Sequence, residues 1–269
     1  MLRLPAVAGQ FYPADPQELS NLIRRYTRTE KTEQKSRVRA CLVPHAGYIY
    51  SGAIAGAVFA RVAIPKKVLL IGVRHYPRGE ALAILSEGAW RTPLGDVPID
   101  GALAKELRGH CPELHEDAVA HSTEHSLEVQ LPFLQVLSPG FSFVPIAAGT
   151  IRFTDLAELG GGIAKALAGR EDEILMVVSS DMNHYEDEET TRWKDQKAIE
   201  QMLKLDARGL FDACRQGEIS MCGLGPAVVM LTVLNRMGAK HAELVRYGTS
   251  GETSGDLDRV VGYAGMTFN

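Results

Sequence analysis

Five stretches of the chain are continuously apolar or β-branched, and they alternate with stretches that carry a helical pattern. Strands are predicted at residues 38–43, 67–73, 82–86, 141–147 and 173–179, with two weaker ones at 242–247 and 259–268. Helices are predicted at residues 51–61, 100–108, 126–137, 154–168, 188–203, 207–216 and 225–237. The runs VLLIGV and ILMVVS lack the alternation of a half-exposed strand, which indicates strands covered by helices on both faces.

The order of these elements predicts the fold class. Strands that alternate with helices are typical of α/β proteins, and we expect a three-layer α/β/α domain around a mixed central sheet. No internal repeat, low-complexity segment or linker divides the sequence, so residues 1–269 are interpreted as one domain. The polar run at residues 27–39 carries charges of both signs and is interpreted as a solvated helix end with a loop.

Composition and charge narrow the possible functions. The chain is 45% hydrophobic and 23% charged, which is ordinary for a globular protein with a substantial core. Its 29 basic and 33 acidic side chains give a net charge of −4, which argues against a nucleic-acid partner. The sequence shows no signal peptide and no apolar stretch of membrane-spanning length. We therefore expect a soluble, cytoplasmic protein whose four scattered cysteines are free thiols.

Histidines follow three of the predicted strands at the point where each strand ends. His45 comes after the first strand, His75 after the second, and Asp181 and His184 after the fifth. Open α/β sheets bind their ligands in the crevice beyond the carboxyl ends of the strands. A single histidine there is more often a satisfied structural residue, but three of eight at such positions favour a functional site.

Cys222 adds a possible sulfur ligand to these imidazoles. It lies in SMCGLGP, where an apolar helix is predicted to begin. Without partners it would be a small buried hydrophobic residue, as most free cysteines are. Together with two imidazoles it favours a site for iron, copper or zinc, because these metals prefer thiolate and imidazole ligands.

The stretch HSTEH allows a second hypothesis, a zinc peptidase. His121 and His125 would be zinc ligands, and Glu200 on a later helix would be the third. This mechanism needs both histidines on one helical face, whereas Ser122 and Thr123 favour a helix that starts inside the motif. We instead expect His125 and Glu128 in the first turn of that helix, both facing the crevice.

The motifs GQFYP, PHAGYIYSG, RTPLGD, EHSLEVQLPF, SSDMNHYE and MCGLGP, in this order, resemble those of the Memo-like proteins (mediator of ErbB-driven cell motility). The resemblance extends from Ala8 to Phe268. The fold of that family is similar to that of the class III extradiol dioxygenases, which are non-haem iron enzymes. The resemblance implies an α/β/α fold of that kind and a similar metal site.

Carried over to this sequence, the resemblance implies that His45, His75 and Cys222 bind a metal, with Fe²⁺ expected first and copper or zinc as alternatives. It further assigns His125 and His184 to the positions that flank substrate and dioxygen, and it makes Asp181 a residue that orients an imidazole. The other candidates are Phe11 and Tyr48 for the pocket wall, and Arg74 for attraction of an anionic substrate or for solvent contact.

One departure from the dioxygenases limits what the resemblance implies. Their iron is held by two histidines and a carboxylate, whereas the third ligand here would be a thiolate. Ring cleavage is therefore not carried over. The hypotheses are a non-haem iron or copper oxidoreductase, a non-enzymatic protein that binds a metal, an anionic ligand or a peptide, and, third, the zinc peptidase. The resemblance also implies a functional link to AMMECR-type and radical-SAM proteins.

Overall fold

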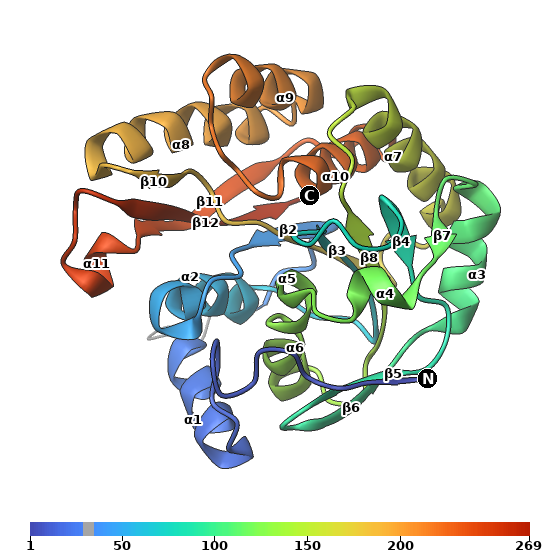
Figure 1. The fold of residues 1–269 in the computed structure, drawn as a ribbon. Helices are drawn as coiled ribbons and strands as arrows, with labels where there is room; N and C mark the ends of the chain where they lie inside the picture. Colours follow the sequence, from blue (N-terminus) through green and yellow to red (C-terminus); the bar gives the residue numbers. More distant parts are fainter. Residues whose placement is uncertain (29–34) are drawn as a thin grey trace.

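The continuously apolar runs form the middle of a mixed sheet in the computed structural model, which describes residues 1–28 and 35–269 (Figure 1). Its central strands pair in parallel in the order β2 (Ala40–Val43), β9 (Ile174–Ser179), β3 (Lys67–Val73) and β8 (Ser142–Ala148). Antiparallel neighbours flank them, β12 (Val260–Phe268) beside β2 and β4 (Leu82–Ile84) beside β8. Beyond these lie β7 (His115–Glu116) next to β4, and β10 (His184–Glu186) and β11 (Ala242–Thr249) next to β12. The prediction of a mixed sheet is confirmed.

Successive residues of a strand point to opposite faces of the sheet, and helices cover both faces here (Figure 1). Leu69 and Ile71 of β3 pack with α3 (Gly101–His110), α7 (Phe153–Leu167), α8 (Glu188–Leu203), α9 (Ala207–Gln216) and α10 (Leu224–Arg236). Val68 and Leu70 of the same strand pack with α1 (Pro16–Tyr26), α2 (Tyr48–Arg61) and α6 (Leu131–Leu137). The two buried clusters make three layers, so the predicted α/β/α fold class is confirmed.

The structure also contains elements that the hydrophobic pattern does not predict. They are α1, α4 (Ala118–His121), α11 (Gly251–Ser254), the edge strands β7 and β10, and a small sheet of β1 (Leu2–Arg3), β5 (Ala89–Thr92) and β6 (Gly95–Pro98). Helix α1 has a local cause, because the Asp15 side chain accepts the Glu18 N–H and Pro16 stands in the first turn. It ends where the polar run 27–39 begins, and residues 29–34 of that run lie outside the described residues.

The single helix predicted at residues 126–137 is two helices, α5 (His125–Glu128) and α6. Pro132 explains the break. A proline has no N–H to continue the hydrogen-bond pattern of a helix, but it is well tolerated in the first turn of a new one. The break allows α5 to lie against β3 while α6 packs against α1 and α2.

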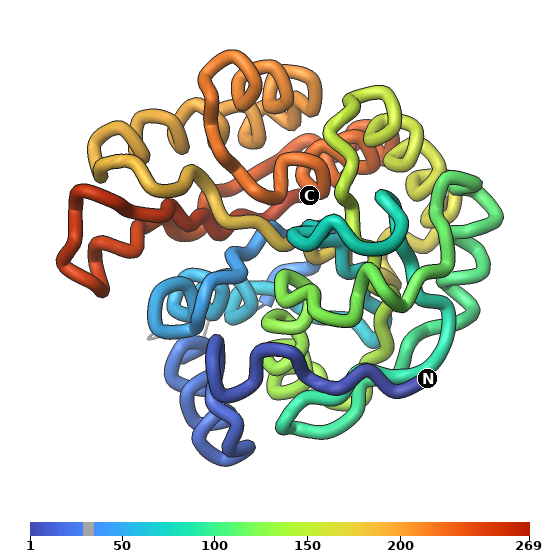
Figure 2. Tube along the Cα trace, in the orientation of Figure 1, coloured from blue at the N-terminus to red at the C-terminus, as the bar shows by residue number. Residues whose placement is uncertain are grey.

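The N-terminal residues run across α5 and α6, as the dark blue tube in Figure 2 shows, and the buried carboxylate of Glu128 fixes them there. Glu128 accepts hydrogen bonds from the Arg3 guanidinium at 2.7 Å, the Ala6 N–H at 2.8 Å and the Tyr12 hydroxyl at 2.6 Å. The prediction that Glu128 faces the crevice is therefore wrong. Its side chain turns toward the N-terminal segment because the polar groups of that segment supply the donors a buried carboxylate needs.

Two further predictions concern the whole chain. Within the described ranges, no helix combines the length and the apolar character that crossing a bilayer requires. The cysteines are free thiols, as predicted: Cys41, Cys111 and Cys214 are buried, and Cys222 is partly exposed.

Candidate metal centre

Loops at one edge of the sheet bring the candidate residues together. His45 lies two residues after β2, His75 two residues after β3, and Asp181 two residues after β9. Since β9 pairs in parallel with both β2 and β3, the carboxyl ends of these strands lie side by side. His125 is the first residue of α5, which contacts β3, and Cys222 stands two residues before α10. Segments that are far apart in the sequence therefore meet at one crevice.

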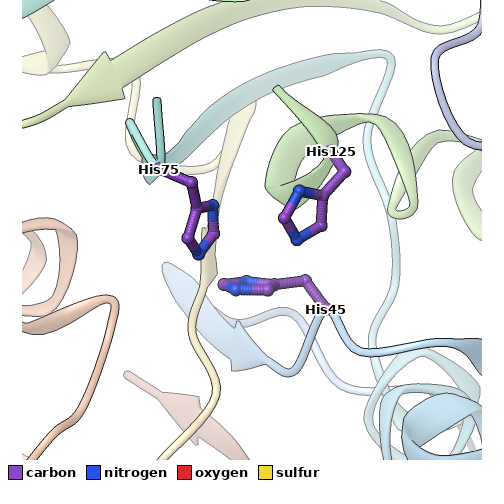
Figure 3. Close-up of side chains that lie close together, drawn as sticks. All are labelled: His45, His75 and His125. Carbon is purple, nitrogen blue, oxygen red and sulfur yellow. The ribbon is translucent and has the colours of Figure 1, made fainter. Parts of the chain in front are cut away.

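Three imidazoles form the centre of this crevice. Within the described part of the chain, His45, His75 and His125 could hold a metal ion, because one nitrogen of each lies within 4.8 Å of the others. Figure 3 shows the rings of His75 and His125 side by side, with the ring of His45 beneath them. The His45 ring is nearly perpendicular to both, at 85° and 84°, whereas His75 and His125 are stacked, with centroids 4.5 Å apart and planes at 20°.

The hydrogen bonds around His45 fix its tautomer. Its Nδ1 lies 2.9 Å from the Ser179 hydroxyl, which donates its own proton to the Ser126 carbonyl at 2.6 Å. Gln130 donates to the same hydroxyl oxygen at 3.0 Å, and its amide is oriented by a second bond to the Pro44 carbonyl. Because the Ser179 proton is already used, the oxygen can only accept from Nδ1–H. The lone pair of His45 therefore resides on Nε2.

His75 is fixed in the same tautomer by a buried carboxylate. Glu124 accepts the backbone N–H of His75 at 2.7 Å and lies 2.9 Å from its Nδ1. Burial alone would raise the pKa of Glu124, but hydrogen bonds from His75 and the Ser126 N–H outweigh it and lower the pKa to about 2. An ionised carboxylate only accepts, so His75 donates from Nδ1 and keeps its lone pair on Nε2. This is the arrangement of a metal-binding histidine supported by a carboxylate.

Burial keeps two of the imidazoles neutral. Burial, followed by the neighbouring histidines, lowers the pKa of His45 to about 3 and that of His125 to about 4. A neutral imidazole can use its lone pair to bind a metal ion. The donor set of imidazole nitrogens with a nearby sulfur fits iron, copper or zinc and does not fit magnesium or calcium.

Cys222 lies beside this group rather than within it. Its Sγ is 3.2 Å from His45 Nε2 and accepts the Asp181 N–H at 3.3 Å. Burial, followed by the nearby Asp181 carboxylate, raises the pKa of the Cys222 thiol. The same Asp181 accepts the His45 N–H at 2.7 Å, so it links the loops that carry His45 and Cys222. Whether Cys222 binds a metal stays a prediction.

His184 lines the crevice and is hydrogen-bonded to Ser220. The Ser220 hydroxyl accepts the His184 N–H at 2.8 Å, and the Ser220 carbonyl lies 3.0 Å from Nδ1. A carbonyl only accepts, so His184 also donates from Nδ1, and its Nε2 has no hydrogen-bond partner among the described residues. Asn183 in turn accepts both the N–H and the hydroxyl proton of Ser220 at 3.0 Å. These bonds position an imidazole that can exchange a proton with a bound molecule.

The crevice is a cavity of about 730 Å³ that opens to solvent. Of the candidate residues, it is lined by Phe11, His45, His75, His125, Asp181, His184 and Cys222. Tyr48 and Arg74 are not part of this lining. Tyr48 is buried in the core and donates to the Val129 carbonyl at 2.6 Å, whereas Arg74 donates to the Gly79 carbonyl and borders a neighbouring cavity.

The residues of the zinc-peptidase hypothesis do not come together. His121 ends α4 and His125 begins α5, so the two are not on one helix. The helix does start inside the HSTEH motif, as predicted, with Glu124 as its N-cap in place of Ser122 or Thr123. Glu200 is exposed on α8, and neither it nor His121 belongs to the group of imidazoles described above.

Sequence reasoning misses the residues that orient the imidazoles. Ser179 contacts His45, Glu124 contacts His75, and Gln130 contacts Ser179 only because the chain folds back over long distances. One signal was available. Glu124 directly precedes a candidate histidine in EHSLE, and an acidic side chain at the start of a helix is free to accept hydrogen bonds.

Glu124→Gln is expected to weaken metal binding about 10–100-fold, because loss of a partner that orients a ligand typically has this effect. The amide offers one acceptor oxygen for two donors of His75 and places its NH₂ group where an acceptor is needed. Chelator competition measures the affinity. Glu158→Gln on the exposed side of α7 is the control and is expected to leave the affinity unchanged. Equal affinities of both variants would contradict the role of Glu124.

Comparison with known proteins gives consistent matches along the whole chain. The sequence profile of a family described as Memo-like protein matches residues 3–267. A MEMO1 family protein of Methanopyrus kandleri is 39% identical over 280 residues, covering 100% of this chain and 99% of its own. One from Aquifex aeolicus is 42% identical over 268 residues, covering 99% of both chains. An uncharacterized protein of Escherichia coli K12 is similar in fold alone, with a TM-score of 0.50, 14% identity, and coverage of 83% of this chain and 98% of its own.

Proposed function

The chain belongs to the Memo-like protein family, and we propose that it is a metal-dependent oxidoreductase. We assign His45, His75 and Cys222 as the metal ligands, with Fe²⁺ as the favoured ion and copper as the alternative. The electron acceptor in this proposal is dioxygen. The observation that supports this proposal is that the Nε2 atoms of His45 and His75 both carry a lone pair. The Nδ1–H groups of His45 and His75 are engaged by Ser179 and Glu124, so both Nε2 lone pairs are available to an ion.

The position of Cys222 supports a thiolate as the third ligand. Two ligands with bonds of about 2.0–2.3 Å to one ion stand roughly 3 Å or slightly more apart. The separation of 3.2 Å between Cys222 Sγ and His45 Nε2 agrees with that spacing. Binding of a cation would also favour the thiolate and so offset the burial that raises the pKa of the thiol.

The stacking of His125 on His75 supports a different role for His125. An imidazole donates its lone pair in the plane of the ring. The planes of the stacked His75 and His125 rings are only 20° apart, and their centroids are separated by 4.5 Å. In this orientation the two lone pairs do not point at one ion at the bonding distance of about 2.0–2.1 Å. In this orientation His125 is better suited to hydrogen-bond a molecule in the crevice than to share an ion with His75.

A bound redox-active ion would supply Lewis acidity and one-electron chemistry to a substrate in the crevice. The chain itself would position the substrate and move its protons. Among the described residues His184 Nε2 has no hydrogen-bond partner, so it can accept a proton and then return it, while His125 can hydrogen-bond a substrate oxygen. Phe11, with its ring centroid 4.9 Å from that of His125, adds an apolar surface to the lining of the crevice.

Cys222→Ser and His125→Ala together test the assignment of ligands. We expect Cys222→Ser to lose most of its bound iron, because a neutral hydroxyl replaces the thiolate, and His125→Ala to retain it. Elemental analysis of protein loaded anaerobically with Fe²⁺ and desalted measures both. Retention by Cys222→Ser with loss by His125→Ala would overturn this ligand set in favour of the three imidazoles.

His184→Ala is expected to reduce turnover about 10²–10⁴-fold while the iron content stays unchanged, because positioned proton transfer contributes a factor of that size. Dioxygen consumption by the iron-loaded protein with phenolic compounds is measured with an oxygen electrode. His241→Ala, an exposed histidine outside the cavity lining, is the control. If iron binds and no compound causes dioxygen consumption by the unmodified chain, the protein is a metal-binding protein without this activity.

A further inference from the structure

A second cavity adjoins the crevice and has a different character. It has a volume of about 800 Å³ and shares Gln10, Phe11 and His125 with the crevice, so the two are neighbours across these residues. Its other walls come mainly from the N-terminal segment 1–7 and from α4, with Tyr76, Leu85, Ser122 and Thr123 completing the lining. Cavities that hold small molecules span about 300–1,000 Å³, so either of these is large enough for part of a ligand.

The exposed apolar side chains of the protein gather at these two cavities. Among the described residues, twelve large hydrophobic side chains are exposed. Five of them line the second cavity and three line the crevice: Met1, Leu2, Leu4, Tyr76 and Val119, then Ile49, Tyr50 and Tyr185. Leu4 is 61% exposed and Val119 56%, so the second cavity offers apolar surface that the fold does not bury. Such a concentration is typical of a binding site rather than of ordinary surface.

The side chains in the described lining of the second cavity offer no unpaired Asp, Glu, Lys or Arg charge to a ligand. Arg3 is the one side chain of the Asp, Glu, Lys and Arg types in its described lining, and its three guanidinium nitrogens are buried and hydrogen-bonded. They bind the Glu128 carboxylate at 2.7 Å and the carbonyl oxygens of His121 and Glu124 at 2.7 and 2.8 Å. A ligand group that lies here therefore gains from apolar contact and not from ion pairing.

We propose that the second cavity binds the apolar tail of the small molecule whose polar head lies at the metal centre. This inference rests on the proposed function and narrows the substrate class to amphipathic compounds, with a metal-binding oxygen or nitrogen head and an alkyl or arylalkyl chain. The tail passes from the imidazoles over Phe11 and His125, which border both cavities, and ends against Leu4 and Val119. A small-molecule tail agrees with a concave cavity that is rich in exposed apolar side chains and adjoins a candidate metal site.

A series of straight-chain hydroxamic acids tests the proposal. The hydroxamate head binds metal ions, and acetohydroxamic, butanohydroxamic, hexanohydroxamic and octanohydroxamic acids differ only in chain length. Isothermal titration calorimetry on the full chain, loaded with redox-silent Zn²⁺, measures their affinities. Each methylene that enters the cavity is expected to strengthen binding about fourfold, so octanohydroxamic acid should bind at least about 100-fold more tightly than acetohydroxamic acid.

Two exposed positions give variants that leave the core intact. Leu4→Gln and Val119→Gln are expected to reduce the gain with chain length at least about tenfold over the series and to leave acetohydroxamic acid unaffected. Leu257→Gln, which is 55% exposed and lines neither cavity, is the matched control and is expected to change nothing. Equal affinities along the series, or an equal loss in the Leu257→Gln control, would overturn the inference.

The metal-free chain separates this inference from the proposed function. If acetohydroxamic acid binds equally with and without Zn²⁺, the metal assignment fails. If its binding requires Zn²⁺ but the affinity does not rise with chain length, the assignment stands and the tail site is wrong. A rise with chain length that Leu4→Gln abolishes supports the tail site in either form of the protein.

Discussion

A His45→Ala variant is expected to lose metal binding altogether under conditions in which the unmodified chain is fully loaded. His45 contributes to every arrangement that the crevice allows, since its Nε2 adjoins Cys222 Sγ and its ring also belongs to the group with His75 and His125. The loss should exceed the 10–100-fold expected for Glu124→Gln, because a ligand is removed rather than the group that orients one. Elemental analysis after anaerobic loading with Fe²⁺ measures the metal content.

His110→Ala is the matched control, because His110 is an exposed histidine at the end of α3, away from the cavity. It is expected to keep its full metal content. Circular dichroism and thermal unfolding of the metal-free proteins show whether His45→Ala retains the fold, which matters because His45 is buried. A folded His45→Ala variant that binds iron as tightly as the control would refute the location of the centre.

The second large effect concerns stability. Glu128→Ala is expected to lower the free energy of unfolding by about 3–5 kcal/mol, because it leaves the buried Arg3 guanidinium without its carboxylate. It also removes the acceptor for Ala6, Val7 and Tyr12, so the segment that carries Phe11 to the crevice loses its attachment. Urea unfolding of the metal-free protein measures the change.

Glu243→Ala is the control for the loss of an ion pair as such. Glu243 also accepts from an arginine, Arg61, at 2.8 Å, but the two side chains are 50% and 46% exposed. Water screens such pairs, so the expected change is about 0–1 kcal/mol. If Glu128→Ala costs no more than Glu243→Ala, the N-terminal segment is held by apolar contacts and the role assigned to Glu128 is wrong.

The sequence predicts the middle of the fold better than its edges. β3, β8 and β9 are continuous apolar runs buried on both faces, and such runs identify a strand without further context. β7 and β10 have only two and three residues, and no periodicity can be recognised in so few. The break between α5 and α6 could have been predicted from Pro132, which excludes a continuous helix there.

The candidate site shows a similar division. Strand ends alone point to His45, His75 and Asp181, because the carboxyl edge of a parallel sheet is where ligands bind. The direction in which a side chain points beyond the end of a strand cannot be predicted in the same way. Tyr48 and Glu128 are themselves predicted to face the crevice, yet each turns to a partner that is distant in the sequence, Val129 for Tyr48 and Arg3 for Glu128. Such partners are set by tertiary structure, which local pattern does not encode.

The strand order has a consequence for how the centre forms during folding. β9 lies between β2 and β3, so the loops of His45 and His75 reach their final separation only after a strand from the second half of the chain is inserted. Cys222 is 177 residues from His45, and closing so long a loop is slow. If an ion is held by His45, His75 and Cys222 as proposed, it would therefore complete its ligand set only late on the pathway. Its binding would therefore lower the rate of unfolding and leave the rate of folding almost unchanged.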